Sequence, residues 1–260
     1  MRNIKHYWID KQLPIICATS TRIGGVSPKP YDSLNLAYHV GDDPYNVTEN
    51  RKIFCGELGI DIDSIVLANQ VHSDNVEIIE SNQAGCGSLG VDDAIANTDA
   101  MITISNSVSI GVMTADCVPV MIFDPKTQSI GIAHAGWKGA VLRIAQKTVL
   151  KMKESFGTDP SDCIVALGPS IMPCCYEVGD DVIARFDDEF GVSTCTKGNK
   201  LNLPRSVEIQ LIDAGVKSDN IASDGTCTAC NLNLFYSHRA ENGVTGRMMS
   251  LIRLKKKEDV

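Results

Sequence analysis

Three segments of the sequence carry side chains able to bind a metal ion, each near the end of an apolar, strand-like run. They are residues 69–74, 114–119 and 133–139, which contain His72, Cys117 and His134. Two imidazoles and one thiolate suit a borderline-soft ion such as zinc. Three protein ligands leave a fourth position for water or substrate, which is typical of a catalytic site. A water held there would have its pKa lowered toward neutrality.

A predicted β-hairpin brings two of these ligands together. The strand-like runs 117–123 and 129–134 flank Asp124-Pro-Lys-Thr127, a turn with proline at its second position. If the hairpin is symmetric about this turn, Phe123 faces Gln128 and Cys117 faces His134. Directly opposed residues have Cβ atoms about 4.5–5.5 Å apart, close enough to share a metal ion or to form an ion pair. A bulge at Pro119 would shift the register by one residue and separate the pair.

The segment after His134 predicts one long helix over residues 137–156. Apolar residues recur along it in steps of three and four, as a core-facing stripe requires, at Val141, Ala145, Val149, Met152 and Phe156. The N-terminus of this helix would attract an anion, and Lys138 would add a positive charge. We therefore expect a phosphate or carboxylate co-substrate beside the metal.

The remaining pattern predicts an α+β layered sandwich. Strand-like runs cover residues 15–19, 65–71, 76–80, 100–104, 108–114, 118–123 and 129–133, and shorter helices are predicted over 180–186 and 204–214. No linker or repeat divides the chain, so we expect a single domain over residues 1–260. The turn-rich segment 19–36 is long enough to be functional, and the chain contains no phosphate-loop motif.

Composition narrows the partners and the compartment. The 260 residues carry 24 basic and 32 acidic side chains, a net charge of −8, which argues against nucleic acid or an anionic membrane as the main partner. The segment Met1–Lys11 has no apolar core of a signal peptide, and no apolar run reaches the length of a membrane span. We expect a cytoplasmic protein whose ten cysteines are free thiols or metal ligands.

Four further cysteines occur in two close pairs. Cys227 and Cys230 have CxxC spacing, but no second pair lies at a matching distance in the sequence. Cys174 and Cys175 are adjacent, and we expect that neighbouring residues cannot easily bind one ion. The pattern therefore predicts four structural thiols.

The residues alone leave other interpretations open. Cys117 could be a small core residue, and His72 and His134 ordinary histidines. Cys117 and His134 could also be the nucleophile and base of a metal-free hydrolase or amidase. A binding protein with a purely structural zinc is a further alternative.

A series of motifs resembles one bacterial family. They include Thr21-Arg-x-Gly-Gly-Val-Ser, Ser33-Leu-Asn-Leu, His39-Val-Gly-Asp-Asp-Pro, Gln70-Val-His, Thr98-Asp-Ala, Thr114-Ala-Asp-Cys-x-Pro, His134-Ala-Gly-Trp, Gly168-Pro-Ser-Ile and Cys174-Cys-Tyr-Glu-Val. The family has been described as polyphenol oxidase or "laccase domain" proteins, and later as purine nucleoside phosphorylases. The resemblance runs from about Thr19 to Arg247, in the order expected of a true match.

The resemblance implies an α/β/β/α sandwich related to a toxin-deamidase-like cysteine hydrolase fold. It implies zinc, with copper possible, held by the catalytic residues His72, Cys117 and His134. The implied reactions are phosphorolysis of adenosine, inosine and 5′-methylthioadenosine, and deamination of adenosine. The implied partners are purine nucleosides and phosphate, for a monomer or small homo-oligomer. The expected substrate contacts are Arg22, Asn35, Arg51, Gln70 and Lys138, of which Arg22, Arg51 and Lys138 could supply charge to phosphate.

Some positions depart from the family pattern. Ser73 follows the motif histidine in place of glycine, and Lys138 follows the motif tryptophan in place of arginine. Lysine keeps the charge but loses bidentate geometry. Phe235-Tyr-Ser-His-Arg-Ala240 is a loosened form of an aromatic and arginine-rich segment. Copper-dependent phenol oxidation is disfavoured, since the five histidines include no His-x-His pair.

Overall fold

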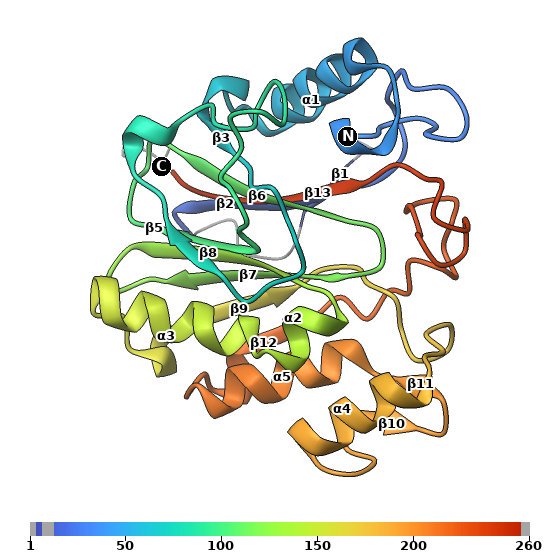
Figure 1. Cartoon of the computed structure of the whole chain (residues 1–260). Helices are drawn as coiled ribbons and strands as arrows, with labels where there is room; N and C mark the ends of the chain where they lie inside the picture. The colour runs from blue at the N-terminus through green and yellow to red at the C-terminus, as the bar shows by residue number, and fades with distance from the viewer. Residues whose placement is uncertain (1–3, 7–12, 256–260) are drawn as a thin grey trace.

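The computed structural model describes residues 4–6 and 13–255 (Figure 1). Two sheets are formed by strands far apart in the sequence. The larger has the order β12 (Ile221–Ser223), β9 (Ile164–Leu167), β7 (Val118–Asp124), β8 (Ser129–Ala135), β5 (Ala100–Thr103) and β4 (Val76–Ile78). The smaller has the order β1 (Ile4–His6), β2 (Ile15–Ser20), β13 (Met248–Leu254), β6 (Ser109–Thr114) and β3 (Ile65–Val66). A two-stranded ribbon joins β10 (Thr196–Lys197) to β11 (Lys200–Leu201).

The helices lie outside the two stacked sheets. Helix α1 (Pro44–Leu58) lies beyond the five-stranded sheet, and the other four lie beyond the six-stranded sheet (Figure 1). These four are α2 (Trp137–Val141), α3 (Ile144–Phe156), α4 (Asp180–Phe190) and α5 (Leu203–Asp213). Short 3-10 turns occur at Tyr38–Val40, Ile62–Ser64, Ser81–Gln83, Pro160–Asp162 and Ser218–Asn220. The layered, mixed α and β architecture is confirmed, and the relation to a toxin-deamidase fold stays a prediction.

Strand alternation divides the core into layers. In β7, Val118, Val120 and Ile122 pack toward the helices, whereas Met121 and Phe123 pack between the sheets. The central strands are apolar on both faces because helices cover one face and the second sheet covers the other. Burial of these two faces is the main apolar contribution to folding. It also means that a polar side chain on the inner face must have a partner.

The predicted hairpin is present, but its register was wrong. Phe123 pairs with Ile130 and not with Gln128, and His134 pairs with Pro119 and not with Cys117. The Asp124 carboxylate accepts hydrogen bonds from the backbone of Lys126 and from Thr127, and Gln128 has a positive φ. The hairpin loop therefore covers residues 125–128, and its centre lies one residue beyond the predicted centre. As a result, each residue of β7 pairs with a residue of β8 two positions further along the chain than predicted.

The predicted helix over 137–156 is two helices. Helix α2 has five residues, and Arg143, with φ of 63°, separates it from α3. The Gln210 side chain occupies the break, since its amide donates to Ala140 O and its oxygen accepts from Ala145 N. The apolar stripe of α3 does face the core. An N-terminus as short as α2 is a weak anion site, because a macrodipole needs aligned turns.

Other predicted elements were partly correct. The predictions for 180–186 and 204–214 correspond to α4 and α5, whereas α1 was not predicted. The run 65–71 leaves the sheet after Val66, since Asn69 N donates to Ile95 O and the Gln70 side chain bonds the Met113 backbone. No helix in the described part of the chain is long and apolar enough to cross a bilayer. Most of Met1–Lys11, on which the expected lack of export rests, lies outside the described residues.

Candidate metal centre

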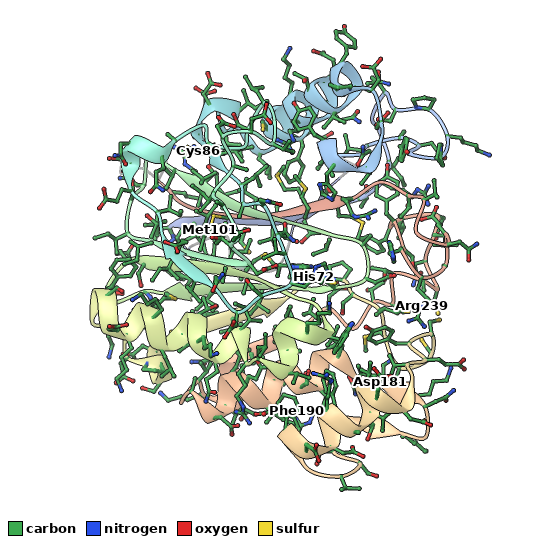
Figure 2. All side chains as sticks on the ribbon, in the orientation of Figure 1. His72, Cys86, Met101, Asp181, Phe190 and Arg239 are labelled. Atoms are coloured by element: carbon green, nitrogen blue, oxygen red, sulfur yellow. The ribbon has the colours of Figure 1, made fainter. Side chains whose placement is uncertain are left out.

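His72, Cys117 and His134 lie together at one end of the layer between the sheets. Their ligand atoms are all within 4.8 Å of one another. Cys117 and His134 share the inner face of the six-stranded sheet, because the register shift of two residues preserves the alternation of faces. His72 reaches the same point from the loop after β3 (Figure 2). Its ring lies edge-on to that of His134, with ring centroids 4.8 Å apart.

The carboxylate of Asp99 positions both histidines. It lies on the inner face just before β5, and His134 N donates to Asp99 O at 2.8 Å, continuing the β5–β8 ladder. Asp99 Oδ1 lies 2.9 Å from His134 Nδ1 and also accepts from His72 N at 3.0 Å. Asp99 Oδ2 accepts from Ser73 N at 2.7 Å and Ser73 Oγ at 2.8 Å. These bonds hold the His72 backbone at a φ of 60° and leave His134 Nε2 free for a ligand.

The sequence prediction missed Asp99, although it lies in the Thr98-Asp-Ala motif. An acidic residue directly before a buried strand is a signal that could have identified it, because a buried carboxylate requires hydrogen-bond donors. Burial raises the pKa of Asp99, but the hydrogen bonds from His134 and Ser73 outweigh this effect and lower it to about 2. The group is therefore ionised throughout the neutral range.

Without a metal, Cys117 and His134 form an ion pair. Burial raises the pKa of the Cys117 thiol, but the positive charge of His134 and hydrogen bonds from His134 and His72 outweigh it and lower the pKa to about 6. Burial lowers the pKa of His134, whereas the Cys117 thiolate and Asp99 raise it to about 9. A thiolate is therefore present at neutral pH, and the thiolate is the form that binds metals.

Position 136 requires glycine because there is no room for a side chain, and not because of its backbone conformation. Its φ is −76°, which any residue adopts. A Cβ at this position would lie 2.8 Å from His72 Cδ2 and 3.1 Å from Cys117 Sγ, inside normal contact distance. The glycine of the His-Ala-Gly-Trp motif therefore allows the ligands to converge.

The three ligands open into a cavity of about 1200 Å³. Basic side chains line it at His39, Arg51, Arg239 and Arg247, together with the acidic Asp116 and Glu177 and the aromatic Trp137 and Tyr176. Burial and the charges of Arg247 and Arg51 lower the pKa of His39, as expected for neighbouring cations. Thr114 also lines the cavity, and its hydroxyl is a buried polar group without a hydrogen-bond partner among the described residues.

The structure brings some of the expected substrate contacts to this cavity. Arg51 lines it, but its guanidinium donates to the carbonyls of Leu36, Gly87 and Ser88. Gln70 lines it too, with its amide held by Met113.

The other expected contacts lie elsewhere. Arg22 lines a separate cavity of about 550 Å³ and is paired with Glu241. Asn35 is buried and donates to Asp42 Oδ2. Lys138 is exposed on α2 and is not part of the cavity lining. Arg239 and Arg247, which were not predicted, contribute the cationic side of the cavity instead.

The prediction that adjacent cysteines could not converge on one ion was wrong in geometry. The thiols of Cys174 and Cys175 lie with those of Cys227 and Cys230, all within 4.8 Å of one another. Residues 173–175 form a turn, in which successive side chains are not on opposite sides as they are in a strand. The lack of a second CxxC pair in the sequence therefore did not predict whether these four thiols lie together.

Comparison with known proteins gives consistent matches over nearly the whole chain. Residues 16–255 match the family described as "Multi-copper polyphenol oxidoreductase laccase". "Purine nucleoside phosphorylase YlmD" of Bacillus subtilis is 36% identical over 93% of this chain and 89% of its own length. "Adenosine deaminase RL5", from an unknown prokaryotic organism, is 32% identical over 92% of this chain and 94% of its own length. The crystal structure of YlmD from Geobacillus stearothermophilus has a TM-score of 0.94 at 31% identity, covering 98% of this chain and 97% of that chain.

Asp99→Asn tests the role of the carboxylate. The amide keeps the shape but can no longer accept at both oxygens from His134 and the His72–Ser73 backbone. We expect zinc affinity to fall by about 10- to 100-fold, as measured by competition with a chelator of known affinity. The exposed Asp92→Asn in the same loop is the matched control and should leave affinity unchanged. Equal affinity in Asp99→Asn and the unaltered protein would contradict this role.

The pKa of Cys117 predicts the pH dependence of its reactivity in metal-free protein. Because the thiolate alone is nucleophilic, the alkylation rate of Cys117 should have its midpoint at a pH of about 6. An ordinary thiol has its midpoint at about 8.5. Peptide mapping after timed alkylation measures the rate. His134→Ala should move the midpoint upward, since burial is then opposed only by the smaller effect of His72, and an unchanged midpoint would exclude the ion pair.

Proposed function

This chain belongs to the family described as multi-copper polyphenol oxidoreductase laccase, and we propose that it is a zinc-dependent purine nucleoside phosphorylase. The observation that carries the proposal is the position of His72, Cys117 and His134 at a cavity lined by cationic and aromatic side chains. The cavity, at about 1200 Å³, is large enough for a nucleoside and a phosphate together. The names of the relatives support an enzyme of this kind.

The donor set fits zinc. Two imidazoles and a thiolate within 4.8 Å match the ligand types of that ion, and Asp99 orients one imidazole as an outer hydrogen-bond partner. When bound by these three residues, zinc would supply a Lewis acid with one open coordination position. The same donors also suit copper. We propose zinc, because the five histidines form no His-x-His pair of the kind that copper oxidases commonly use.

We assign phosphate binding to the cationic side of the cavity. Arg247 lies close enough to His39 for its charge to lower the pKa of that imidazole, and the Arg247 guanidinium retains donors beyond its bonds to Thr245 O and Gly246 O. Arginine binds phosphate through two parallel hydrogen bonds, which orient as well as attract it. These groups would hold a phosphate oxygen toward the anomeric carbon of the ribose.

The remaining lining suits the nucleoside. In phosphorolysis the phosphate oxygen bonds to the anomeric carbon, the bond to the purine nitrogen breaks, and the purine leaves with the bonding electrons. Trp137 and Tyr176 offer aromatic surfaces for a purine ring. Adenosine, inosine and 5′-methylthioadenosine share this purine and ribose chemistry.

Deamination of adenosine is a second candidate reaction. It is favoured by the relative named adenosine deaminase and by the donor set, since zinc deaminases of nucleobases also use histidine and cysteine ligands. Deamination releases ammonia and needs no phosphate. Ammonia production from adenosine in phosphate-free buffer therefore distinguishes it from phosphorolysis.

Product analysis tests the proposed activity. Zinc-loaded protein should release hypoxanthine and ribose 1-phosphate from inosine only when phosphate is present. His72→Ala should lower the rate by about 100-fold or more, since loss of a ligand is at least as severe as loss of an outer hydrogen-bond partner. Failure to form ribose 1-phosphate in a metal-loaded preparation would refute the assignment. An amidase activity that survives His72→Ala would instead favour a metal-free Cys117–His134 hydrolase.

Arg247→Gln tests the phosphate assignment. Loss of a charge-assisted hydrogen bond should raise the KM for phosphate by about 10-fold or more, with a smaller effect on the KM for inosine. Lys138→Gln removes a positive charge outside the cavity and should leave both values unchanged. The opposite pattern, with Lys138→Gln affected and Arg247→Gln normal, would place phosphate outside the cationic side of the cavity.

A further inference from the structure

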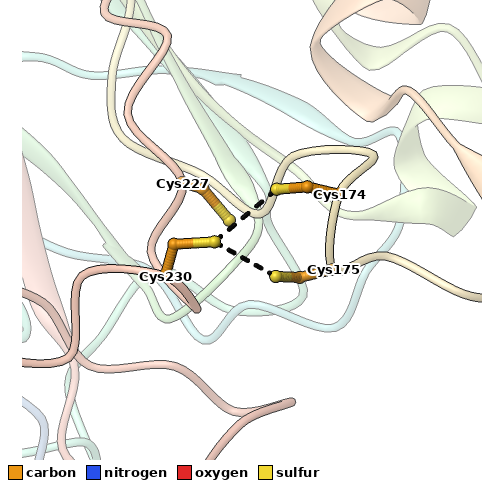
Figure 3. A group of neighbouring side chains, drawn as sticks. All are labelled: Cys174, Cys175, Cys227 and Cys230. Atoms are coloured by element: carbon orange, nitrogen blue, oxygen red, sulfur yellow. Dashed lines mark hydrogen bonds between the residues drawn. The ribbon is translucent and has the colours of Figure 1, made fainter.

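We propose that Cys174, Cys175, Cys227 and Cys230 form a second metal site, a structural zinc site with four thiolate ligands. The four thiols converge from two separate segments of the chain, as Figure 3 shows. Cys175 Sγ lies 3.3 Å from Cys230 Sγ, and Cys174 Sγ lies 3.7 Å from the same atom. This site is independent of the proposed function, since none of its ligands belongs to the catalytic group.

The distances fit tetrahedral coordination. A zinc–sulfur bond of about 2.3 Å places the four sulfurs of a tetrahedron about 3.8 Å apart. The separations of 3.3 Å and 3.7 Å, with all four sulfurs within 4.8 Å of one another, are consistent with this value. All four cysteines are free thiols in the structure, as are the other six. Four sulfur donors with no open position are typical of structural zinc, in contrast to the three ligands of the catalytic group.

The backbone around the quartet is organised as two facing turns. The first is closed by Cys175 N and Tyr176 N, which both donate to Met172 O. The second is supported by the Asn231 side chain, which donates to Cys227 O at 2.8 Å. The two segments are joined by a bridge between Ser170 and Cys227. Met172 N–H also points at Cys227 Sγ, at 3.4 Å, the type of donor that stabilises a metal-bound thiolate.

The quartet has a structural reason to exist, because it joins two loops that wall the cavity. Tyr176 and Glu177 follow the first pair of cysteines, and His238 and Arg239 follow the second pair, and all four line the cavity. Asp116, next to Cys117, accepts from Ile171 N and from the Thr228 hydroxyl, one residue beyond Cys227. A metal at the quartet would therefore hold these loops in register with the catalytic ligands.

Zinc content and zinc spectroscopy of the full-length protein test this site. The unaltered protein should hold two zinc ions per chain if both sites are occupied, and Cys117→Ala should retain the quartet ion. X-ray absorption at the zinc edge of Cys117→Ala should show four sulfur neighbours at about 2.3 Å. The double variant Cys175→Ser/Cys230→Ser should lose this ion. Cys86→Ser, which lies in neither group, is the matched control and should retain it.

The contradicting results are equally specific. Cys117→Ala protein without zinc, or with zinc bound mainly by nitrogen and oxygen, would overturn the proposal. So would iron in place of zinc, or an intact mass showing disulfides within the quartet. If the double variant fails to fold, the X-ray absorption spectrum of Cys117→Ala still tests the proposal, since this variant retains all four cysteines of the quartet. If only the catalytic group fails to bind zinc, the unaltered protein holds one ion with four sulfur neighbours, and the two proposals are separated.

Discussion

The buried carboxylate of Asp99 is the contact on which the geometry of the metal centre depends. It accepts from the His134 ring, from the backbone of Val71, His72 and Ser73, and from the Ser73 hydroxyl. One charged group thereby fixes a ring tautomer on a strand and the path of a loop. An ionised carboxylate is costly to bury, and this set of donors compensates for that cost. The same bonds keep its pKa low and help to keep that of His134 high.

The layered fold explains why the site is where it is. Asp99, Cys117 and His134 all lie on the inner face of the six-stranded sheet, just before β5, just before β7 and near the end of β8. The sheet supplies rigid positions for two ligands and their carboxylate partner. Loops supply His72 and the cavity walls. This arrangement is common in binding sites, where loops carry the functional residues and a rigid scaffold positions the loops. A zinc ion bound by four thiolates would hold the two loops that contain the cysteine quartet more rigidly than their hydrogen bonds alone.

Much of the site could be predicted because it depends on local pattern. His72, Cys117 and His134 were proposed as one group from strand ends, and their side chains do converge, although the predicted pairing of Cys117 with His134 was wrong by two residues without changing the face. Spacing could not reveal the Asp124 hydrogen bonds that lengthen the hairpin loop, or the Gln210 contacts that accompany the helix break. Arg22 and Lys138 were selected by charge, but their direction depends on tertiary packing. The cysteine quartet joins segments 55 residues apart, so only the fold reveals it.

A crystal structure of the zinc-loaded protein, with anomalous diffraction recorded on both sides of the zinc absorption edge, tests the central claim most directly. The account predicts an anomalous peak bonded to His72, Cys117 and His134 Nε2, with Asp99 still bonded to His134 Nδ1 and the fourth position facing the cavity. A peak whose fourth coordination position is filled by another protein side chain would indicate a structural metal. No peak at these residues in zinc-saturated crystals would contradict a metal centre organised by Asp99.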